Sequence, residues 1–219
     1  HEQPLLAATD AVRVVGWNLH NAGASKVPKI VRVVRSLGAD VNVLSEYSSK
    51  VSEIREALGV ASASWTETTP APRLLGVAIA APGGLERLDD TDPCPPWGCC
   101  ERWQHEPTVI VGDFNNGENF RGAPNEAFVY SDKFMALHDH GFRDGWRERR
   151  PDGVGIDYSC WNQRYGWRRL DHFFVSDHID VDAPMYINEA DGLDLLRTQE
   201  HPSRVGVPDH AALVAEGPR

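Results

Sequence analysis

The chain has 219 residues, 41% of them hydrophobic and 25% charged, and this composition is typical of a globular protein rather than a disordered one. Its length suits one large domain, so we expect a single domain over residues 1–219. No apolar run approaches the roughly 20 residues that a membrane-spanning helix needs. The formal net charge of −10 argues against a general polyanion-binding protein, whose surface would be net basic.

The four cysteines match neither the paired spacing of a zinc site nor the framework of a disulfide-rich secreted protein. We therefore expect Cys94, Cys99, Cys100 and Cys160 to be reduced and structural. The sequence has no signal-like apolar segment, although it begins with His1 rather than Met. These observations favour a cytoplasmic location.

Apolar periodicity predicts strands and helices along most of the chain. Three helices are expected, at residues 26–37, 50–58 and 131–140, and each ends at a glycine. Residues 81–107 show no period and are rich in proline and glycine, which is uncommon inside a compact domain. Besides the stretch discussed next, strands are expected at residues 12–19, 41–46, 60–68, 74–80, 158–161 and 170–176. Residues 179–181 with 185–187 suggest one more, and a last strand follows Pro208.

The most informative stretch is residues 109–115. Its first three residues are β-branched and apolar, which predicts a strand buried on both faces. Asp113 and Asn115 follow, so a carboxylate and a carboxamide lie two residues apart where the chain leaves the sheet. Residues two apart on a strand share a face, and strand ends in layered α/β folds are where sites are usually built. An ordinary turn after a buried strand is the alternative explanation.

Four other strand ends carry polar side chains. Singly, each has an ordinary explanation, because charged residues often simply face water: Glu46 as a solvated strand end, Asp171 as an outward-facing carboxylate, His210 as a surface histidine. Together, in a fixed order, they indicate a site assembled from several strand ends. The five positions are Asn18; Glu46; Asp113 with Asn115; Asp171; and Asp209 with His210.

The series GWNLHN, LSEY, VIVGDFN, YSCWNQRYGWRRLDHFFVS and PDHAAL resembles the endonuclease/exonuclease/phosphatase superfamily. This group includes exonuclease III-type nucleases, DNase I and the neutral sphingomyelinases, and the likeness is greatest to bacterial members of unassigned substrate. It covers most of the chain, from about residue 12 to residue 213. The resemblance implies an α/β fold, a four-layer DNase I-like sandwich of two packed mixed β-sheets flanked by helices. It also implies metal-dependent hydrolysis of a phosphoester.

The resemblance also implies a role for each strand-end residue. Glu46 and Asp209 match metal carboxylates, with Asn18 beside them at the metal. Asp113 and Asn115 match the pair that orients or deprotonates the attacking water and contacts the phosphate. His210 matches the catalytic histidine, and Asp171 matches the acid that orients it.

The chemistry of these residues agrees with that assignment. Phosphodiester hydrolysis needs charge neutralised on the phosphoryl oxygens and an aligned water. Carboxylate and carbonyl oxygens suit Mg²⁺ or Mn²⁺, and an acidic site holding such a cation reverses its local charge. A histidine held by an aspartate keeps one tautomer and is stabilised as the imidazolium. We therefore expect a Mg²⁺ or Mn²⁺ cofactor that also raises the melting temperature.

Residues 81–107 depart from the family, whose members carry more structure here and a Tyr or His that contacts the scissile phosphate. This chain has no Tyr in the stretch, and its His105 stands at the wrong end of the following strand. Either the segment is naturally shortened, or residues are missing from the sequence at this point; we favour the second explanation. His20, where relatives carry Asp or Asn, is either a ligand or a loop histidine. Cys160 and an extra arginine in the Trp-Arg-Arg-Leu element argue against an abasic-site pocket.

These features favour a monomeric endo- or exonuclease acting on DNA or RNA. The second hypothesis is a phosphatase or sphingomyelinase-like hydrolase of small or lipid phosphoesters, which the net negative charge favours. The third is a non-catalytic member of the fold that only binds. Aromatic residues in the C-terminal half either stack on bases or cap the sandwich edge. These are Trp161, Tyr165 and Trp167, interleaved with Arg147, Arg149, Arg150, Arg164, Arg168 and Arg169.

Overall fold

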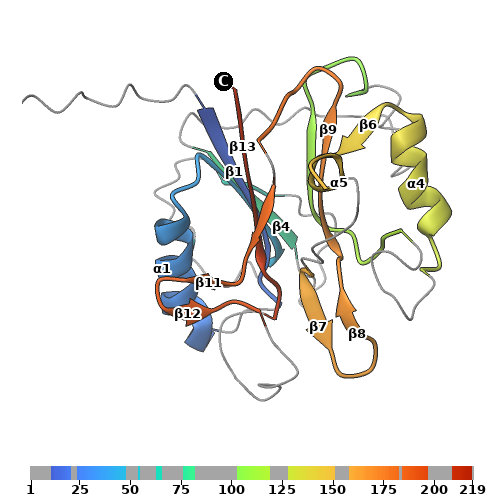
Figure 1. The fold of residues 1–219 in the computed structure, drawn as a ribbon. Helices are drawn as coiled ribbons and strands as arrows, with labels where there is room; N and C mark the ends of the chain where they lie inside the picture. The colour runs from blue at the N-terminus through green and yellow to red at the C-terminus, as the bar shows by residue number, and fades with distance from the viewer. Residues whose placement is uncertain are drawn as a thin grey trace, which may run out of the picture.

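The computed structural model describes residues 11–20, 24–47, 54, 63–65, 76–81, 103–118, 128–150, 158–182, 184–196 and 209–218. Within these ranges the chain forms a mixed α/β fold, as expected. Figure 1 shows two sheets side by side with a helix on each outer face. No helix among the described residues is long and apolar enough to cross a membrane.

The larger sheet has six strands in the order β10-β13-β1-β2-β4-β3. Strands β1 and β2 are parallel, and the other neighbouring pairs are antiparallel. The parallel pair places the ends of β1 and β2 at the same edge of the sheet. The strands are β1 (Ala11–Asn18), β2 (Val41–Tyr47), β3 (Ala63–Trp65), β4 (Gly76–Ala80), β10 (Met185–Ile187) and β13 (Ala212–Pro218).

The smaller sheet has the antiparallel order β5-β9-β6. It consists of β5 (Val109–Asp113), β9 (Asp171–Ser176) and β6 (Phe142–Asp144). Two hairpins complete the strands: β7 (Cys160–Asn162) with β8 (Gly166–Arg168), and β11 (Glu189–Ala190) with β12 (Leu193–Asp194). The helical segments are η1 (Ala24–Lys26), α1 (Val27–Leu37), α4 (Ser131–Asp139) and α5 (Gly145–Glu148).

Three apolar clusters hold the layers together. Helix α1 packs on the larger sheet through the face that carries Ile30 and Val34. Between the sheets, Phe173 and Val175 of β9 meet Leu213 of β13. Helix α4 covers the outer face of the smaller sheet through Phe134, in the third cluster. Burial of apolar surface at roughly 25 cal/mol per Å² makes these three contacts the main stabilising term.

The two predicted helices that the structure describes are confirmed, and their ends have local causes. Helix α1 has Pro28 in its first turn, where the missing N–H costs no hydrogen bond. It ends at Gly38, which adopts the left-handed conformation (φ 59°) and donates its N–H to the Arg35 carbonyl at 3.3 Å. Helix α4 buries Phe134 and Leu137, the residues predicted to face inward.

The sheets approach each other closely where β1 crosses β5. A Cβ atom at Gly16 would lie 2.5 Å from the Cγ2 atom of Val111, far inside van der Waals contact. A larger residue at position 16 would therefore require the Val111 side chain or one of the two strands to move.

Some strand predictions were wrong. Val109 is 36% exposed, and Ile110 and Val111 are half-buried, so β5 is not the doubly buried strand that its composition predicted. Among the described residues β5 pairs only with β9, so no described strand is hydrogen-bonded to its other edge. Residues 179–181 form no strand. The predicted helix at 50–58, apart from the helical residue Ile54, and most of residues 81–107 lie outside the described residues.

Candidate active site

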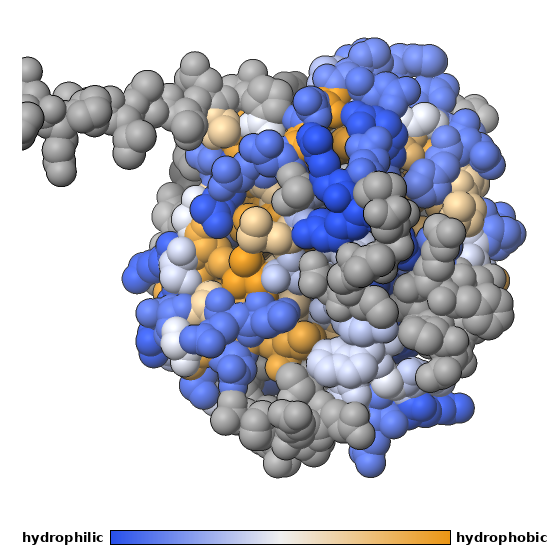
Figure 2. Space-filling model, viewed as in Figure 1, coloured by the Kyte–Doolittle hydropathy of each residue, from blue (hydrophilic) through white to orange (hydrophobic). Residues whose placement is uncertain are grey.

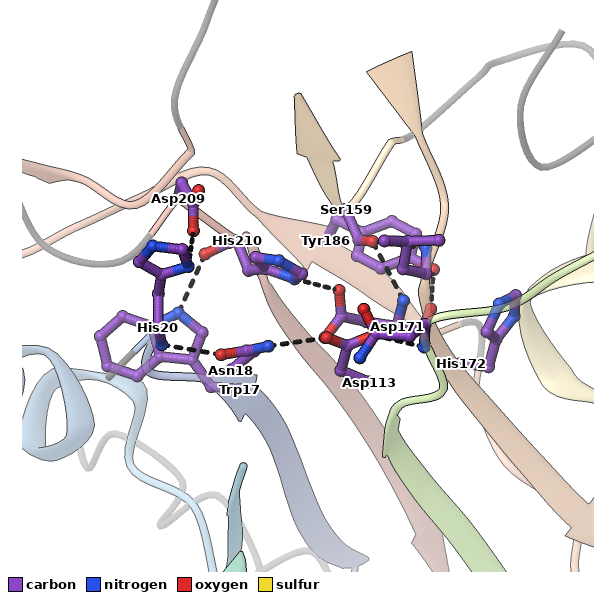
Figure 3. A network of polar contacts seen from close by, with 12 residues as sticks. Trp17, Asn18, His20, Asp113, Ser159, Asp171, His172, Tyr186, Asp209 and His210 are labelled. Carbon is purple, nitrogen blue, oxygen red and sulfur yellow. Dashed lines mark hydrogen bonds and ion pairs between the residues drawn. The ribbon is translucent and has the colours of Figure 1, made fainter. Parts of the chain in front are cut away.

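The polar strand-end residues converge from both sheets (Figure 3). Asn18 ends β1 and Glu46 lies near the end of its parallel neighbour β2. Asp113 ends β5 and is directly opposite Asp171, the first residue of the antiparallel strand β9. The larger sheet thus supplies the first pair of residues and the smaller sheet the second.

Asn18 joins two carboxylates from different sheets. Its Nδ2 donates to Glu46 Oε1 at 3.2 Å and to Asp113 Oδ2 at 2.7 Å. Its Oδ1 accepts the backbone N–H of His20 at 2.7 Å, so the orientation of the amide is fixed by its partners. Glu46 reaches this position from a left-handed backbone conformation (φ 52°), at an irregularity in the β2–β4 pairing. Asn18 is 1% exposed, so this bridge is sheltered from water.

Asp113 is held from both sides. Its Oδ1 accepts the backbone N–H of Asn115 at 2.7 Å, and Asn115 itself is exposed with φ 48°. Burial of the Asp113 carboxyl, together with the nearby Asp171 carboxylate, raises its pKa to about 6. His210 and the hydrogen bonds from Asn115 and Asn18 oppose that rise. At neutral pH Asp113 is therefore ionised and close to its pKa.

His210 and Asp171 form a buried pair at the junction of the sheets. His210 Nδ1 lies 2.8 Å from Asp171 Oδ2. Burial disfavours the charged imidazolium, but the Asp171 carboxylate outweighs it and, with Asp113 and Asp209, raises the pKa of His210 to about 9. His210 is therefore protonated at neutral pH, with Nδ1 facing the carboxylate and Nε2 as its other donor.

The fold and this geometry can be compared with known proteins. No protein-family model matches the chain, and no curated protein matches it by sequence. Among solved structures, a Neisseria 3′ phosphatase, NExo, bound to a product DNA hairpin superposes with a TM-score of 0.65 at 18% identity, over 95% of this chain and 100% of that one. The 3′–5′ exonuclease NExo from Neisseria meningitidis gives a TM-score of 0.64 at 17% identity, over 95% and 100%. Truncated Caenorhabditis elegans TDP2 gives 0.62 at 14% identity, over 95% and 98%.

The chain has a DNase I-like fold. The resemblance that the sequence motifs indicated is therefore confirmed at the level of the fold. In this DNase I-like fold, the convergent strand ends lie at one edge of the two sheets, where the motifs predicted them.

The carboxylates of the site have the donor chemistry of a Mg²⁺ or Mn²⁺ site. Glu46 and Asp209 supply carboxylate oxygens, the ligands that these hard cations prefer. Within the described residues, no three His, Cys, Asp or Glu side chains lie close enough to enclose an ion by themselves. Mg²⁺ ordinarily takes one or two carboxylates and completes its shell with water and substrate oxygens. The donor set therefore fits the cofactor expected for this DNase I-like fold.

The structure bears on the predicted metal roles of Asn18 and Asp209 and on the position of His20. Asn18 directs its amide nitrogen at the carboxylates, so it would have to turn to ligate a metal through its carbonyl oxygen. Asp209 directly precedes His210 in the sequence, and its Oδ1 lies 3.1 Å from Nδ1 of the exposed His20. His20 thus lies at the site rather than elsewhere on the surface (Figure 3).

The arginines of the C-terminal half lie in two separate regions. Arg147 and Arg149 pair with Glu118 and Asp180 near α5, where Figure 2 shows a hydrophilic surface. The β7–β8 hairpin lies toward the opposite end of the smaller sheet (Figure 1). There, the guanidinium groups of Arg164 and Arg168 lie 4.9 Å and 5.0 Å from the ring centroid of Tyr165.

The hairpin adjoins the Asp171–His210 pair. The backbone of Cys160, in β7, forms a β-bridge with His210. On the other side of β7, Cys160 is the register partner of Arg168 in β8. Cross-strand partners share a face of the sheet, so Arg168 is on the same face as His210. Trp161 is buried and Trp167 stacks on Tyr158 with centroids 5.6 Å apart, which leaves Tyr165, 37% exposed, as the accessible ring.

Sequence reasoning missed a second polar cluster on the opposite face of β9. Asp144 accepts a bidentate ion pair from Arg169, and both side chains are almost fully buried. His172 lies between this pair, with Nδ1 3.8 Å from Asp144 Oδ2, and the Asn116 carbonyl oxygen, 2.9 Å from Nε2. Burial and the Arg169 charge lower the pKa of His172, so it is neutral. The sequence offered a signal only for the histidine, because His172 is a polar residue at the start of the apolar run of β9.

Cys160 is a free, buried thiol, as expected; the other three cysteines lie outside the described residues. Burial, and then the nearby Asp171 carboxylate, raises the pKa of the Cys160 thiol. It therefore remains protonated and unreactive at neutral pH, in agreement with a structural role.

Proposed function

We propose that this protein is a divalent-metal-dependent phosphodiesterase that hydrolyses DNA or RNA by attack of a water molecule. The observation that carries the proposal is the convergence of Asp113, linked to Glu46 through Asn18, with the buried Asp171–His210 pair. Asp113 has a pKa of about 6 and His210 a pKa of about 9, so a base and an acid coexist between these pH values.

Asp113 is the proposed general base. Its Oδ1 and Oδ2 are fixed by Asn115 and Asn18, which aims the carboxylate and leaves its remaining lone pairs for a water. As the water oxygen bonds to phosphorus, one of its protons passes to Asp113. The exposed Asn115 beside it is proposed to contact a phosphate oxygen through its side-chain amide.

His210 is the proposed acid and electrostatic partner. With Nδ1 held by Asp171, its Nε2–H can donate to a phosphoryl oxygen as negative charge develops there. The same proton can pass to the leaving oxygen when its bond to phosphorus breaks. Asp171 keeps the imidazole in one orientation throughout, as the aspartate does in hydrolase triads.

Glu46 and Asp209 are the proposed ligands of Mg²⁺ or Mn²⁺. When bound, the cation would neutralise charge on the phosphoryl oxygens and orient the phosphate. Asn18 fixes Glu46 relative to Asp113, so ligand and base keep a constant separation.

Nucleic acid is the favoured substrate because of the β7–β8 hairpin beside the site. Two guanidinium groups around the partly exposed Tyr165 suit a phosphate backbone with bases beside it. The fold-related Neisseria phosphatase was solved with a DNA hairpin, which is consistent with such a substrate.

The test is a substrate panel with Mg²⁺ or Mn²⁺, in which wild type is compared with Asp113→Asn. We expect plasmid nicking or shortening of oligonucleotides by wild type, and a loss of at least about 100-fold in the variant. Asp132→Asn, on helix α4, changes an exposed carboxylate and is the matched control. Equal activity of wild type and Asp113→Asn would contradict the proposal.

The second candidate is hydrolysis of small or lipid phosphoesters, and the formal charge of −10 favours it because it disfavours long polyanions. Release of inorganic phosphate from 3′-phosphorylated ends, or of phosphocholine from sphingomyelin, without polymer cleavage would support it. If neither wild type nor variant acts on any member of the panel, the protein is a binding member of the fold.

A further inference from the structure

Ser159 lies behind the Asp171–His210 pair and contacts the chain on both sides of it (Figure 3). Its Oγ accepts the backbone N–H groups of Leu170 at 2.8 Å and Asp171 at 3.0 Å. Its carbonyl oxygen accepts the backbone N–H of Ala211, the residue after His210, at 2.8 Å. One fully buried residue thus holds the backbone next to both members of the pair.

Each member of the pair also has an anchor of its own. The Tyr186 hydroxyl donates to the Asp171 carbonyl oxygen at 2.5 Å, and Trp17 Nε1 donates to the His210 carbonyl oxygen at 3.0 Å. These anchors come from β10 and β1, and neither of them connects Asp171 to His210. The connection through backbone hydrogen bonds is made at Ser159.

We propose that Ser159 is a positioning residue that sets the separation and orientation of Asp171 and His210. An alanine at this position leaves two buried N–H donors on the Asp171 side without their acceptor. The backbone must then move to find another acceptor, and the Asp171 carboxylate moves with it. The kinetic consequence of this inference rests on the proposed hydrolase function, whereas its structural consequence does not.

The experiment compares Ser159→Ala with Ser159→Thr, which keeps the hydroxyl, and with Ser176→Ala as a matched control. Ser176 is also fully buried and lies at the far end of the same strand, β9. Its Oγ likewise accepts a backbone N–H, from Thr108 at 3.0 Å, but it contacts neither member of the pair. Two quantities are measured: the downfield NMR resonance of the His210 Nδ1 proton, and kcat with KM on the best substrate of the panel.

We expect Ser159→Ala to lose or shift the Nδ1 resonance and to lower kcat on the order of 100-fold with little change in KM, since a misplacement near 1 Å has such an effect. Ser159→Thr is expected to restore both quantities. Ser176→Ala is expected to lower the melting temperature and to leave the resonance and kcat unchanged.

The proposal is overturned if Ser159→Ala behaves like Ser176→Ala, or if Ser159→Ala and Ser159→Thr are equally impaired in a folded protein. If Ser159→Ala does not fold, Ser159→Cys replaces it, because sulfur is a weaker acceptor of similar shape. A wild-type resonance and kcat in that variant would also overturn the proposal. Should no substrate be found, the resonance decides the role of Ser159 while the hydrolase proposal fails separately.

Discussion

Two histidines of this protein each lie beside a buried aspartate, yet they carry opposite charge states. His210, 2.8 Å from Asp171, has its pKa raised to about 9. His172, 3.8 Å from Asp144, has its pKa lowered. Asp171 and His172 are consecutive on β9, so the two pairs occupy opposite faces of one strand.

The difference is explained by Arg169. This arginine makes a bidentate ion pair with Asp144 and holds the pKa of that carboxyl well below its ordinary value, against the effect of burial. With the negative charge already neutralised, Asp144 has little left with which to stabilise a second cation. The carboxylate of Asp171 faces no arginine among the described residues, so His210 is its counter-ion. In this protein, the buried aspartate that stabilises a protonated histidine is the one without an arginine partner among the described residues.

The largest expected effect comes from removing the charge on the His210 side. Asp171→Asn should return the pKa of His210 toward 6.5 and lower kcat by about 10³- to 10⁴-fold, as loss of the orienting aspartate does in hydrolase triads. The measurements are an NMR titration of His210 and steady-state kinetics. Asp177→Asn, 69% exposed just beyond the other end of β9, is the control and should match wild type. If Asp171→Asn keeps kcat within tenfold of wild type, the charge of Asp171 does not have the role assigned to it.

The next effect concerns His172. Removal of Arg169 should leave His172 as the main partner of Asp144, as His210 is of Asp171. Arg169→Met leaves Asp144 buried and without its main partner, and we expect the free energy of unfolding to fall by about 3–5 kcal/mol. The pKa of His172 should rise in the same variant. Urea denaturation and NMR titration measure the two effects. Arg143→Met, which breaks half-exposed ion pairs with Glu148 and Asp177 and a hydrogen bond to the Ile179 carbonyl, should cost less than Arg169→Met because these groups remain partly hydrated.

A smaller effect is the pH dependence of stability in metal-free protein. His210 has a folded pKa of about 9 against an ordinary value of 6.5. Its contribution is therefore fully present below pH 6.5 and lost as the pH rises through 9, a difference of about 3 kcal/mol. Denaturation in EDTA between pH 6.5 and 9 should show this decline, and His210→Gln should abolish it. A decline of equal size in the variant would assign it to another group.

The smallest expected effect is the stabilisation of the protein by its proposed metal. At a concentration tenfold above its Kd, Mg²⁺ or Mn²⁺ should stabilise the protein by about 1.4 kcal/mol, which raises the melting temperature by a few degrees. Glu46→Gln should remove this gain, because it takes away a proposed ligand, whereas Arg143→Met should retain it. An unchanged melting curve at millimolar Mg²⁺ and Mn²⁺ would argue against the metal site.

The parts of the molecule that were predictable from sequence are those governed by local pattern. The apolar period of α1 and its glycine stop identify that helix without reference to the rest of the chain. The strand-end residues Asn18, Glu46 and Asp113 were found because each follows an apolar run, and the structure brings these three together. Their chemical roles remain predictions.

The parts that were not predictable depend on long-range pairing. Asp144 and Arg169 are 25 residues apart and carry no local signal that they neutralise each other inside the protein. Val109 belongs to a run that looks fully buried, but its exposure depends on which strands lie beside β5. A strand was predicted at residues 158–161, where β7 lies, but its partner β8 and their pairing as a hairpin were missed, although Gly166 (φ 77°) stands where β8 begins.

The absence of a side chain at Gly16 has a consequence for the width of the active site. Gly16 of β1 lies against Val111 of β5 where the two sheets meet. Asn18 and Asp113 stand two residues further along these strands. The hydrogen bond of 2.7 Å between this amide and this carboxylate therefore spans a gap whose size is fixed by the glycine. A methyl group at position 16 would press on the Val111 side chain and disturb the packing beside this link between the two sheets. The close packing at Gly16 thus supports the connection through Asn18 between the proposed metal ligand Glu46 and the proposed base Asp113.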